Sequence, residues 1–176
     1  GLDRAFFLVA FPVVVPLLAV CSLAVRIDSP GPIMFSQWRT GQHGVRFRMY
    51  KFRTMVANAE ELKAEYAHLN ILPYPDFKIP DDPRVTRVGR MLRKTSLDEL
   101  PQLLNVLRGD MSLVGPRPWP RSMVDNQVAH GLDYRNQVVA GWTGAAQVQK
   151  GITEPAGFTA LDLEYVEACR TSSGLG

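Results

Sequence analysis

The chain has 176 residues, of which 46% are hydrophobic and 21% are charged, and its formal net charge is +3. This composition excludes a disordered or collagen-like chain, and two cysteines are too few for a disulfide scaffold. The hydrophobic residues gather at the N-terminus, because residues 5–25 contain no charged side chain. An uncharged run of this length is a candidate membrane segment.

The ends and the middle of this run predict how it meets a bilayer. Arg4 and Arg26 flank it, and cations prefer the cytoplasmic side of a membrane. Pro12 and Pro16 lie inside it, where a proline removes a backbone donor and kinks or breaks a helix. A helix broken near its middle can turn back and keep both arginines on one side. We therefore expect a re-entrant membrane helix over residues 1–27.

Two other interpretations of the N-terminal run remain. A helix of this length, kinked at its prolines, would just span a bilayer. A cleaved signal peptide is disfavoured, because Asp3 lies at its start and no small-residue cleavage site follows it.

Residues 28–176 are predicted to form one domain of mixed, mainly helical α+β structure, with amphipathic helices at the membrane interface. Apolar periodicity and turn residues define its elements. In chain order we expect a β-hairpin over 32–37 and 45–52, a helix over 56–69, a proline-rich loop over 73–83, helices over 86–94 and 97–107, a turn over 115–118 and a helix over 161–169.

Basic residues gather in two stretches that contain no acid, 39–53 and 84–94. Such stretches are attracted to anionic lipid headgroups, with about 1 kcal/mol per cation. Some of these side chains can also hold phosphates, because arginine offers a bidentate fork to phosphoryl oxygens. Nucleic-acid binding is disfavoured, because aromatic residues are not interleaved with the cations as a stacking surface requires.

An acidic pair, Asp98 and Glu99, directly follows the second basic stretch. One interpretation is structural: Ser96 would be the N-cap of a helix, Glu99 would complete a capping box, and Asp98 would lie in the first turn. The other is chemical, because one carboxylate can attack phosphorus while its neighbour holds a divalent cation. The spacing alone leaves both interpretations open.

Five sequence strings occur in a characteristic order: DSPGP at 28–32, YKFRTM at 50–55, SLDELPQ at 96–102, NVLRGDMSLVGPRP at 105–118 and GWTG at 141–144. Together they resemble the bacterial sugar transferases, which are monotopic phosphoglycosyl transferases. The resemblance covers roughly residues 3–167.

The resemblance implies a reaction and its participants. Such enzymes transfer a sugar 1-phosphate from a UDP-sugar to polyprenyl (undecaprenyl) phosphate, with Mg²⁺ as cofactor and UMP as product. They begin exopolysaccharide, O-antigen or glycoprotein glycan synthesis at the bacterial inner membrane, and their catalytic domain, here residues 28–176, faces the cytoplasm. Inner-membrane lipids are expected partners, and a homo-oligomer is compatible with the resemblance.

The resemblance also assigns roles to particular residues. Asp98 matches the nucleophile that forms a covalent phosphosugar enzyme, and Glu99 matches the carboxylate that binds or orients Mg²⁺. Four residues in the family's strings match contacts to the substrate, and Pro16 matches the break of the membrane helix. The four expected substrate contacts are Lys51, Arg53, Arg117 and Gln147.

The chain departs from the family pattern at four places. Val15 replaces the serine before the helix-breaking proline, and Ala140 replaces a proline. Alanines lie at 145 and 146, where the family has an aromatic residue nearby, and Lys150 lies where an arginine is usual. This divergence leaves an alternative function open, a membrane-anchored scaffold of a polysaccharide assembly complex with impaired catalysis. The abrupt ends of the chain indicate a fragment of a longer protein.

Overall fold

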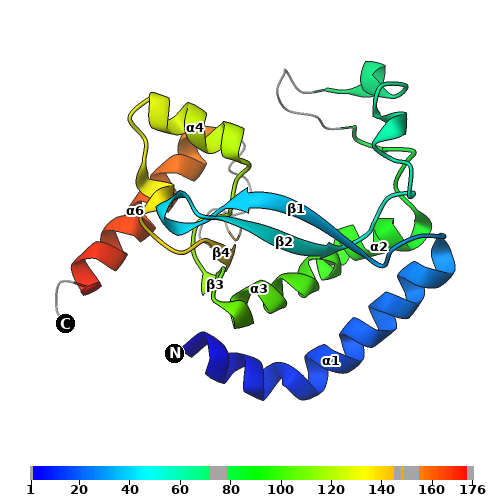
Figure 1. Cartoon of the computed structure of the whole chain (residues 1–176), viewed down its shortest axis with the longest axis horizontal. Helices are drawn as coiled ribbons and strands as arrows, with labels where there is room; N and C mark the ends of the chain where they lie inside the picture. Colours follow the sequence, from blue (N-terminus) through cyan, green and yellow to red (C-terminus); the bar gives the residue numbers. More distant parts are fainter. Residues whose placement is uncertain (1, 72–78, 145–147, 149–154, 174–176) are drawn as a thin grey trace. The chain divides into compact units, whose positions relative to one another are not determined.

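The computed structural model describes residues 2–71, 79–144, 148 and 155–173. This part of the chain contains five α-helices and two two-stranded sheets, which confirms the prediction of a mixed, mainly helical fold. The helices and strands in chain order are α1 (Leu2–Asp28), β1 (Met34–Thr40), β2 (Arg46–Phe52), α2 (Arg87–Thr95), α3 (Leu103–Arg108), β3 (Ser112–Val114), α4 (Arg121–Ala129), β4 (Gly141–Thr143) and α6 (Pro155–Ser173). Figure 1 shows these elements coloured along the chain.

The chain divides into two compact units. The first, called the hairpin unit, comprises Gly1–Phe11, Ser36–Tyr50 and Gln102–Gly176. The second comprises Pro12–Phe35 and Lys51–Pro101, and we call it the dyad unit because it contains the acidic dyad Asp98 and Glu99. The predicted division into a membrane-inserted segment and a catalytic domain concerns the bilayer and stays a prediction.

Helix α1, blue in Figure 1, is assigned as one helix that contains both Pro12 and Pro16. Its stretch Val9–Asp28 has a mean hydropathy of 2.2, is only 11% buried within the protein, and is long and apolar enough to cross a membrane. Val9 and Val13 are 81% and 69% exposed. Apolar side chains so exposed need a surrounding other than water, such as lipid. The re-entrant path stays a prediction.

The core of the hairpin unit lies against one face of strand β2. Phe47 and Met49 project from β2 and pack with Val106 of α3 and with Met111, which precedes β3. The fully buried Asn105 of α3 joins these elements by hydrogen bonds. Its Oδ1 accepts from the backbone N–H of Tyr50 at 3.1 Å, and its Nδ2 donates to the Arg48 carbonyl at 2.7 Å. The β-hairpin predicted from sequence is confirmed.

Strands β3 and β4 form a parallel pair that the sequence did not predict. The backbones of Gly115 and Gly141 touch there: a Cβ atom added to Gly141 would lie 2.1 Å from the Gly115 nitrogen. Gly115 donates to the Thr143 carbonyl at 2.8 Å, and Gly141 donates to the Pro116 carbonyl at 2.9 Å. Both glycines are therefore required by a backbone contact between two of the five sequence strings.

Two predicted helices are corrected. Residues 56–69, all described, form turns and the short 3₁₀ helices η2 (Glu61–Lys63) and η3 (Ala67–Leu69) instead of an α-helix. None of these residues is buried, and a helix of this length is marginal without a packing surface. The predicted helix over 97–107 splits into the 3₁₀ helix η4 (Leu97–Gln102) and α3, because Pro101 cannot donate an α-helical hydrogen bond.

Candidate active site

The acidic dyad lies in the first turn of η4, immediately after a reversal of the backbone at Ser96. Ser96 has the left-handed angles φ 58° and ψ 14° and ends helix α2. Its backbone carbonyl accepts the Glu99 N–H at 3.2 Å. The predicted capping box is therefore wrong, because Ser96 ends the preceding helix instead of beginning the next one. The sharp turn brings Asp98 and Glu99 directly after the basic helix α2.

Lys51, which the resemblance gives as an expected substrate contact, forms an ion pair with Glu99 of the dyad. Its Nζ lies 2.7 Å from Glu99 Oε1, and both side chains are about four-fifths buried. Lys51 is the penultimate residue of β2, so the strand fixes where its stem begins. A charge-assisted hydrogen bond of this length holds the Glu99 carboxylate in one orientation.

The carboxylate of Asp98 has a different environment. Burial raises the pKa of Asp98, the cation of Lys51 lowers it, the neighbouring Glu99 raises it, and Arg93 lowers it. Within the described residues, Asp98 makes no hydrogen bond to the side chain of another residue. The dyad therefore contains one carboxylate engaged by a lysine and one that is available to a ligand.

Arg93 is a part of this site that the predicted list of site residues missed. Its Nε donates to Thr54 Oγ1 at 2.9 Å, and its side chain is exposed at the end of α2. Arg93 is also close enough to lower the pKa of Asp98. The signal in the sequence was the acid-free stretch 84–94, which contains Arg93.

Helix α2 is fixed against the segment that follows β2. Thr86 donates its backbone N–H to the Thr54 carbonyl at 3.0 Å. A Cβ atom added to Gly89 would lie 2.2 Å from that same carbonyl oxygen, so only glycine permits the approach. The first turn is capped by Thr86 Oγ1, which accepts from Gly89, and by Asp28 Oδ2, which accepts from Val88, both at 3.0 Å. These contacts set the position from which Arg93 extends.

Arg53, predicted to contact phosphate, is buried and binds the turn after α1. Its guanidinium donates to the Ser29 carbonyl at 2.7 Å, the Pro30 carbonyl at 2.9 Å and Ser29 Oγ at 2.9 Å. Gly31 has φ +118°, and a Cβ atom there would lie 2.2 Å from an Arg53 nitrogen. The string DSPGP therefore forms the turn to which the Arg53 side chain binds. These contacts lend no support to a contact between Arg53 and phosphate.

A buried ion pair holds the loop that enters α2. Arg84 Nε and a terminal nitrogen lie 2.9 and 2.6 Å from the two oxygens of Asp82, and both side chains are over nine-tenths buried. Arg84 also donates to the Ala59 carbonyl at 3.1 Å. Hydrogen bonds from Arg84 lower the pKa of Asp82. The pair thus ties residues 82–84 to the turns of 56–69.

Arg117 and Gln147 are the other two predicted substrate contacts. Arg117 belongs to the hairpin unit and is exposed in the turn after β3. Burial lowers the pKa of Arg39, and the nearby charge of Arg117 lowers it further. Two guanidinium groups this close suit an anion such as phosphate. Gln147 lies outside the described residues.

The carboxylates of the dyad suit a magnesium ion that also binds a phosphorylated substrate. Among the described residues, no group of three histidines, cysteines or carboxylates could form a metal site made of protein alone. Mg²⁺, however, is usually bound by one or two carboxylates together with water and substrate phosphates. Asp98 and Glu99 supply adjacent carboxylates of this kind. The residues therefore fit a magnesium ion that is shared with a phosphorylated substrate.

Comparisons with known proteins show the family of the chain. A family model described as bacterial sugar transferase matches residues 1–175, and the chain belongs to that family. The UDP-N-acetylgalactosamine-undecaprenyl-phosphate N-acetylgalactosaminephosphotransferase of Aeromonas hydrophila is 40% identical over 167 residues, which cover 94% of this chain and 37% of that protein. The UDP-glucose:undecaprenyl-phosphate glucose-1-phosphate transferase of Caulobacter vibrioides is 43% identical over 160 residues, which cover 86% of this chain and 56% of that protein.

A third relative has another sugar in its name. The undecaprenyl-phosphate galactose phosphotransferase of Salmonella typhimurium is 44% identical over 137 residues, which cover 76% of this chain and 28% of that protein. The chain thus spans between about a quarter and just over a half of these curated relatives.

Proposed function

We propose that this chain transfers a sugar 1-phosphate from a UDP-sugar to polyprenyl phosphate and releases UMP. The observation that carries the proposal is the asymmetry of the dyad: Glu99 is held by Lys51, whereas Asp98 is available beside the cations Lys51 and Arg93. Membership of the bacterial sugar transferase family supports it, because the relatives are named for transfer to undecaprenyl phosphate.

The proposed reaction has two displacements at one phosphorus atom. An oxygen of Asp98 attacks the β-phosphorus of the UDP-sugar, the bond to the bridging oxygen breaks, and UMP leaves with that oxygen. An oxygen of polyprenyl phosphate then attacks the same phosphorus, and the Asp98 carboxylate leaves. The product is a polyprenyl diphosphosugar. Two steps let a soluble donor and a lipid acceptor use one carboxylate in turn.

The surrounding charges have separate parts in this scheme. Lys51 and Arg93 favour the ionised form of Asp98 against the effect of burial, and only that form is a nucleophile. When bound, magnesium held by Glu99 supplies positive charge to the phosphoryl oxygens as negative charge develops on them. Arg117 with Arg39 is proposed as a further phosphate contact.

Helix α1 is the basis for the proposed location of the enzyme at the membrane. We propose that α1 enters the bacterial inner membrane from the cytoplasm as a re-entrant helix that turns at Pro16. The exposure of its apolar side chains supports contact with lipid, and Arg26 near its end prefers the cytoplasmic side. This arrangement would keep the dyad unit at the level of the lipid phosphates.

One experiment tests both activity and orientation. Sealed inside-out membrane vesicles that carry this chain receive polyprenyl phosphate, Mg²⁺ and UDP-glucose, UDP-galactose or UDP-N-acetylgalactosamine. We expect UMP from at least one donor in inside-out vesicles and none in sealed right-side-out vesicles, because UDP-sugars do not cross a bilayer. Folded chain that gives no UMP with any donor would contradict the activity, and UMP in right-side-out vesicles alone would contradict the orientation.

Replacing Lys51 with methionine is expected to move the acid limb of the pH profile of UMP release to higher pH. Lys51 lowers the pKa of Asp98, so its loss lets burial and Glu99 raise that pKa further. Because Asp98 reacts as the anion, activity then fails at a higher pH. The control is Lys63→Met on η2, an exposed lysine 3.6 Å from Glu60, which should keep the original profile. If the acid limb of Lys51→Met stays at its original pH, Lys51 does not lower the pKa of the group that reacts, and the proposed role of Lys51 beside Asp98 is contradicted.

A further inference from the structure

The structure divides the basic stretch 39–53 between separate contacts. Lys51 pairs with the dyad, and Arg53 binds the turn after α1. Arg46 and Arg48, by contrast, are exposed on β2. Within the part of the chain that the structure describes, neither of these two guanidinium groups has an ion pair or a hydrogen bond. The protein leaves the charges of both arginines open to an external partner.

Arg46 and Arg48 lie on the outer face of the β-hairpin. Side chains alternate along a strand, and the intervening Phe47 is buried in the core. On the neighbouring strand β1, the side chain of Trp38 is 51% exposed. The guanidinium carbons of both arginines lie 5.2 Å from the centre of its ring, so the three side chains share one face. This face combines two exposed cations with an exposed indole.

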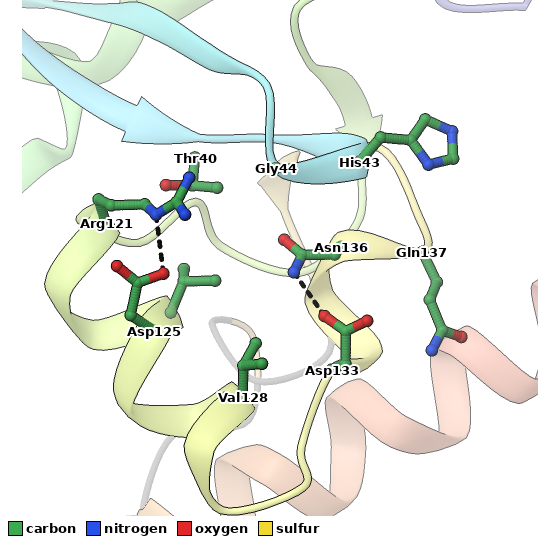
Figure 2. A pocket seen from close by; sticks show the side chains of 10 residues that line it. Thr40, His43, Gly44, Arg121, Asp125, Val128, Asp133, Asn136 and Gln137 are labelled. Atoms are coloured by element: carbon green, nitrogen blue, oxygen red, sulfur yellow. Dashed lines mark hydrogen bonds and ion pairs between the residues drawn. The ribbon is translucent and has the colours of Figure 1, made fainter.

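The turn of the hairpin is tied to the rest of its unit. The strands are joined by the 3₁₀ turn η1 (Gln42–Gly44), and the side-chain nitrogen of Gln42 donates to the Gln137 carbonyl at 3.1 Å. Gln137 directly follows the 3₁₀ turn η5 (Tyr134–Asn136), which Figure 2 shows beside this end of the hairpin. The outer face is therefore carried by a hairpin with a fixed position in the unit.

The same unit contains the start of helix α1. The hydroxyl of Ser112 donates to the Asp3 carboxylate at 2.9 Å. Ser112 follows Met111, which packs with Phe47 and Met49 on the inner face of β2. Because both ends of the proposed re-entrant helix lie at the cytoplasmic surface of the membrane, these contacts would hold the hairpin close to the lipid headgroups.

The rings on the outer face favour lipid headgroups over nucleic acid. A single-stranded nucleic acid stacks successive bases on several exposed rings. Here only Trp38 is exposed, because Tyr50 is partly buried and its hydroxyl accepts from Arg108 at 2.8 Å. Tryptophan prefers the interface between lipid and water, and arginine attracts anionic headgroups. An exposed indole beside two arginines has both properties.

We propose that the outer face of the hairpin, formed by Trp38, Arg46 and Arg48, binds anionic phospholipids at the membrane surface. The indole lies among the headgroups, and the two guanidinium groups donate to lipid phosphates. This proposal rests on the contact of α1 with lipid proposed above, but not on the transfer reaction. It gives the hairpin unit an attachment to the membrane of its own.

The test is quenching of tryptophan fluorescence in the full chain, reconstituted into vesicles of equal parts phosphatidylcholine and phosphatidylglycerol. One of the two lipids at a time carries bromine on its acyl chains, and the signal of Trp38 is the difference between the chain and Trp38→Phe. We expect brominated phosphatidylglycerol to quench Trp38 more strongly, with an enrichment of the anionic lipid of about fivefold for each arginine. The double variant Arg46→Gln, Arg48→Gln should lose this preference.

The matched control is the double variant Arg121→Gln, Arg170→Gln, which removes the same charge from the same unit. Both of these arginines are already paired with carboxylates. Arg121 Nε lies 2.7 Å from Asp125, as Figure 2 shows, and a terminal nitrogen of Arg170 lies 3.5 Å from Glu167. This variant should keep the preference of Trp38 for phosphatidylglycerol. If Trp38→Phe does not fold, total tryptophan quenching is compared between the two double variants.

Flotation of the vesicles separates this proposal from the one on α1. Chain that does not float with the vesicles contradicts both. The hairpin proposal alone is overturned if the chain floats but the two brominated lipids quench Trp38 equally or not at all, or if the preference survives in Arg46→Gln, Arg48→Gln. It is also overturned if a single-stranded oligonucleotide or a trace of polyprenyl phosphate abolishes the preference, because the face would then bind that ligand instead.

Discussion

The Asp98→Asn variant is expected to release UMP at least about a thousandfold more slowly than the unchanged chain and to form no covalent phosphosugar adduct. The amide cannot attack phosphorus, although it has the shape of the carboxylate. Folding should not suffer, because burial disfavours the charge of Asp98, as its raised pKa shows. Measured Tm should therefore stay level or rise. UMP release, intact mass after incubation with donor alone, and thermal unfolding measure the three effects.

Asp81→Asn is the matched control, because Asp81 is an exposed carboxylate of the same unit outside the site. It should keep both the rate and the adduct. An adduct of sugar phosphate that persists in Asp98→Asn would contradict Asp98 as the nucleophile, whatever the rate of UMP release.

The second large effect is expected on stability. Replacing Arg84 with methionine leaves the buried carboxylate of Asp82 without its bidentate partner. Breaking a buried pair on one side costs about 3 kcal/mol or more, which lowers the Tm of a chain of this size by about 6–12 °C. Thermal unfolding in detergent, followed by circular dichroism, measures the change.

The control for Arg84 is Arg121→Met, which removes an ion pair of similar length whose side chains are more than half exposed. That loss should cost less than about 1 kcal/mol. The contribution of Asp82 also has a defined pH dependence, because its folded pKa is lowered. The stability gained is fully present above the ordinary pKa of about 3.9 and is lost as pH falls through the lowered value. A difference between Arg84→Met and the unchanged chain that persists at low pH would contradict this assignment.

Local signals in the sequence predicted much of the dyad unit. The basic helix expected over residues 86–94 is α2, because its apolar spacing and the N-cap Thr86 act within one helical turn. The family strings assigned Lys51 as a substrate contact and Asp98 and Glu99 as the catalytic pair, but the ion pair of Lys51 with Glu99 became visible only in the structure. The membrane candidate was found by length and composition alone.

Features that depend on distant partners could not be predicted in this way. Residues 56–69 have the composition of a helix, but periodicity does not reveal whether a surface is present to pack against. The burial of Arg53 against Ser29 and the contact of Gly89 with Thr54 arise between segments that are distant in the sequence. The hydrogen bond from Thr40 to the Trp119 carbonyl, which joins the end of β1 to the residues before α4, likewise leaves no motif in the sequence.

The backbone contact between Gly115 and Gly141 fixes strands β3 and β4 against each other and leaves the segment between them free to change in sequence and length. The two glycines join the ends of a loop, residues 116–140, that contains α4 and η5. Changes inside such a closed loop leave its two anchor strands in register. The loop can therefore be lengthened or replaced without moving the two joined strands, which makes it a suitable place to insert a reporter sequence in this chain.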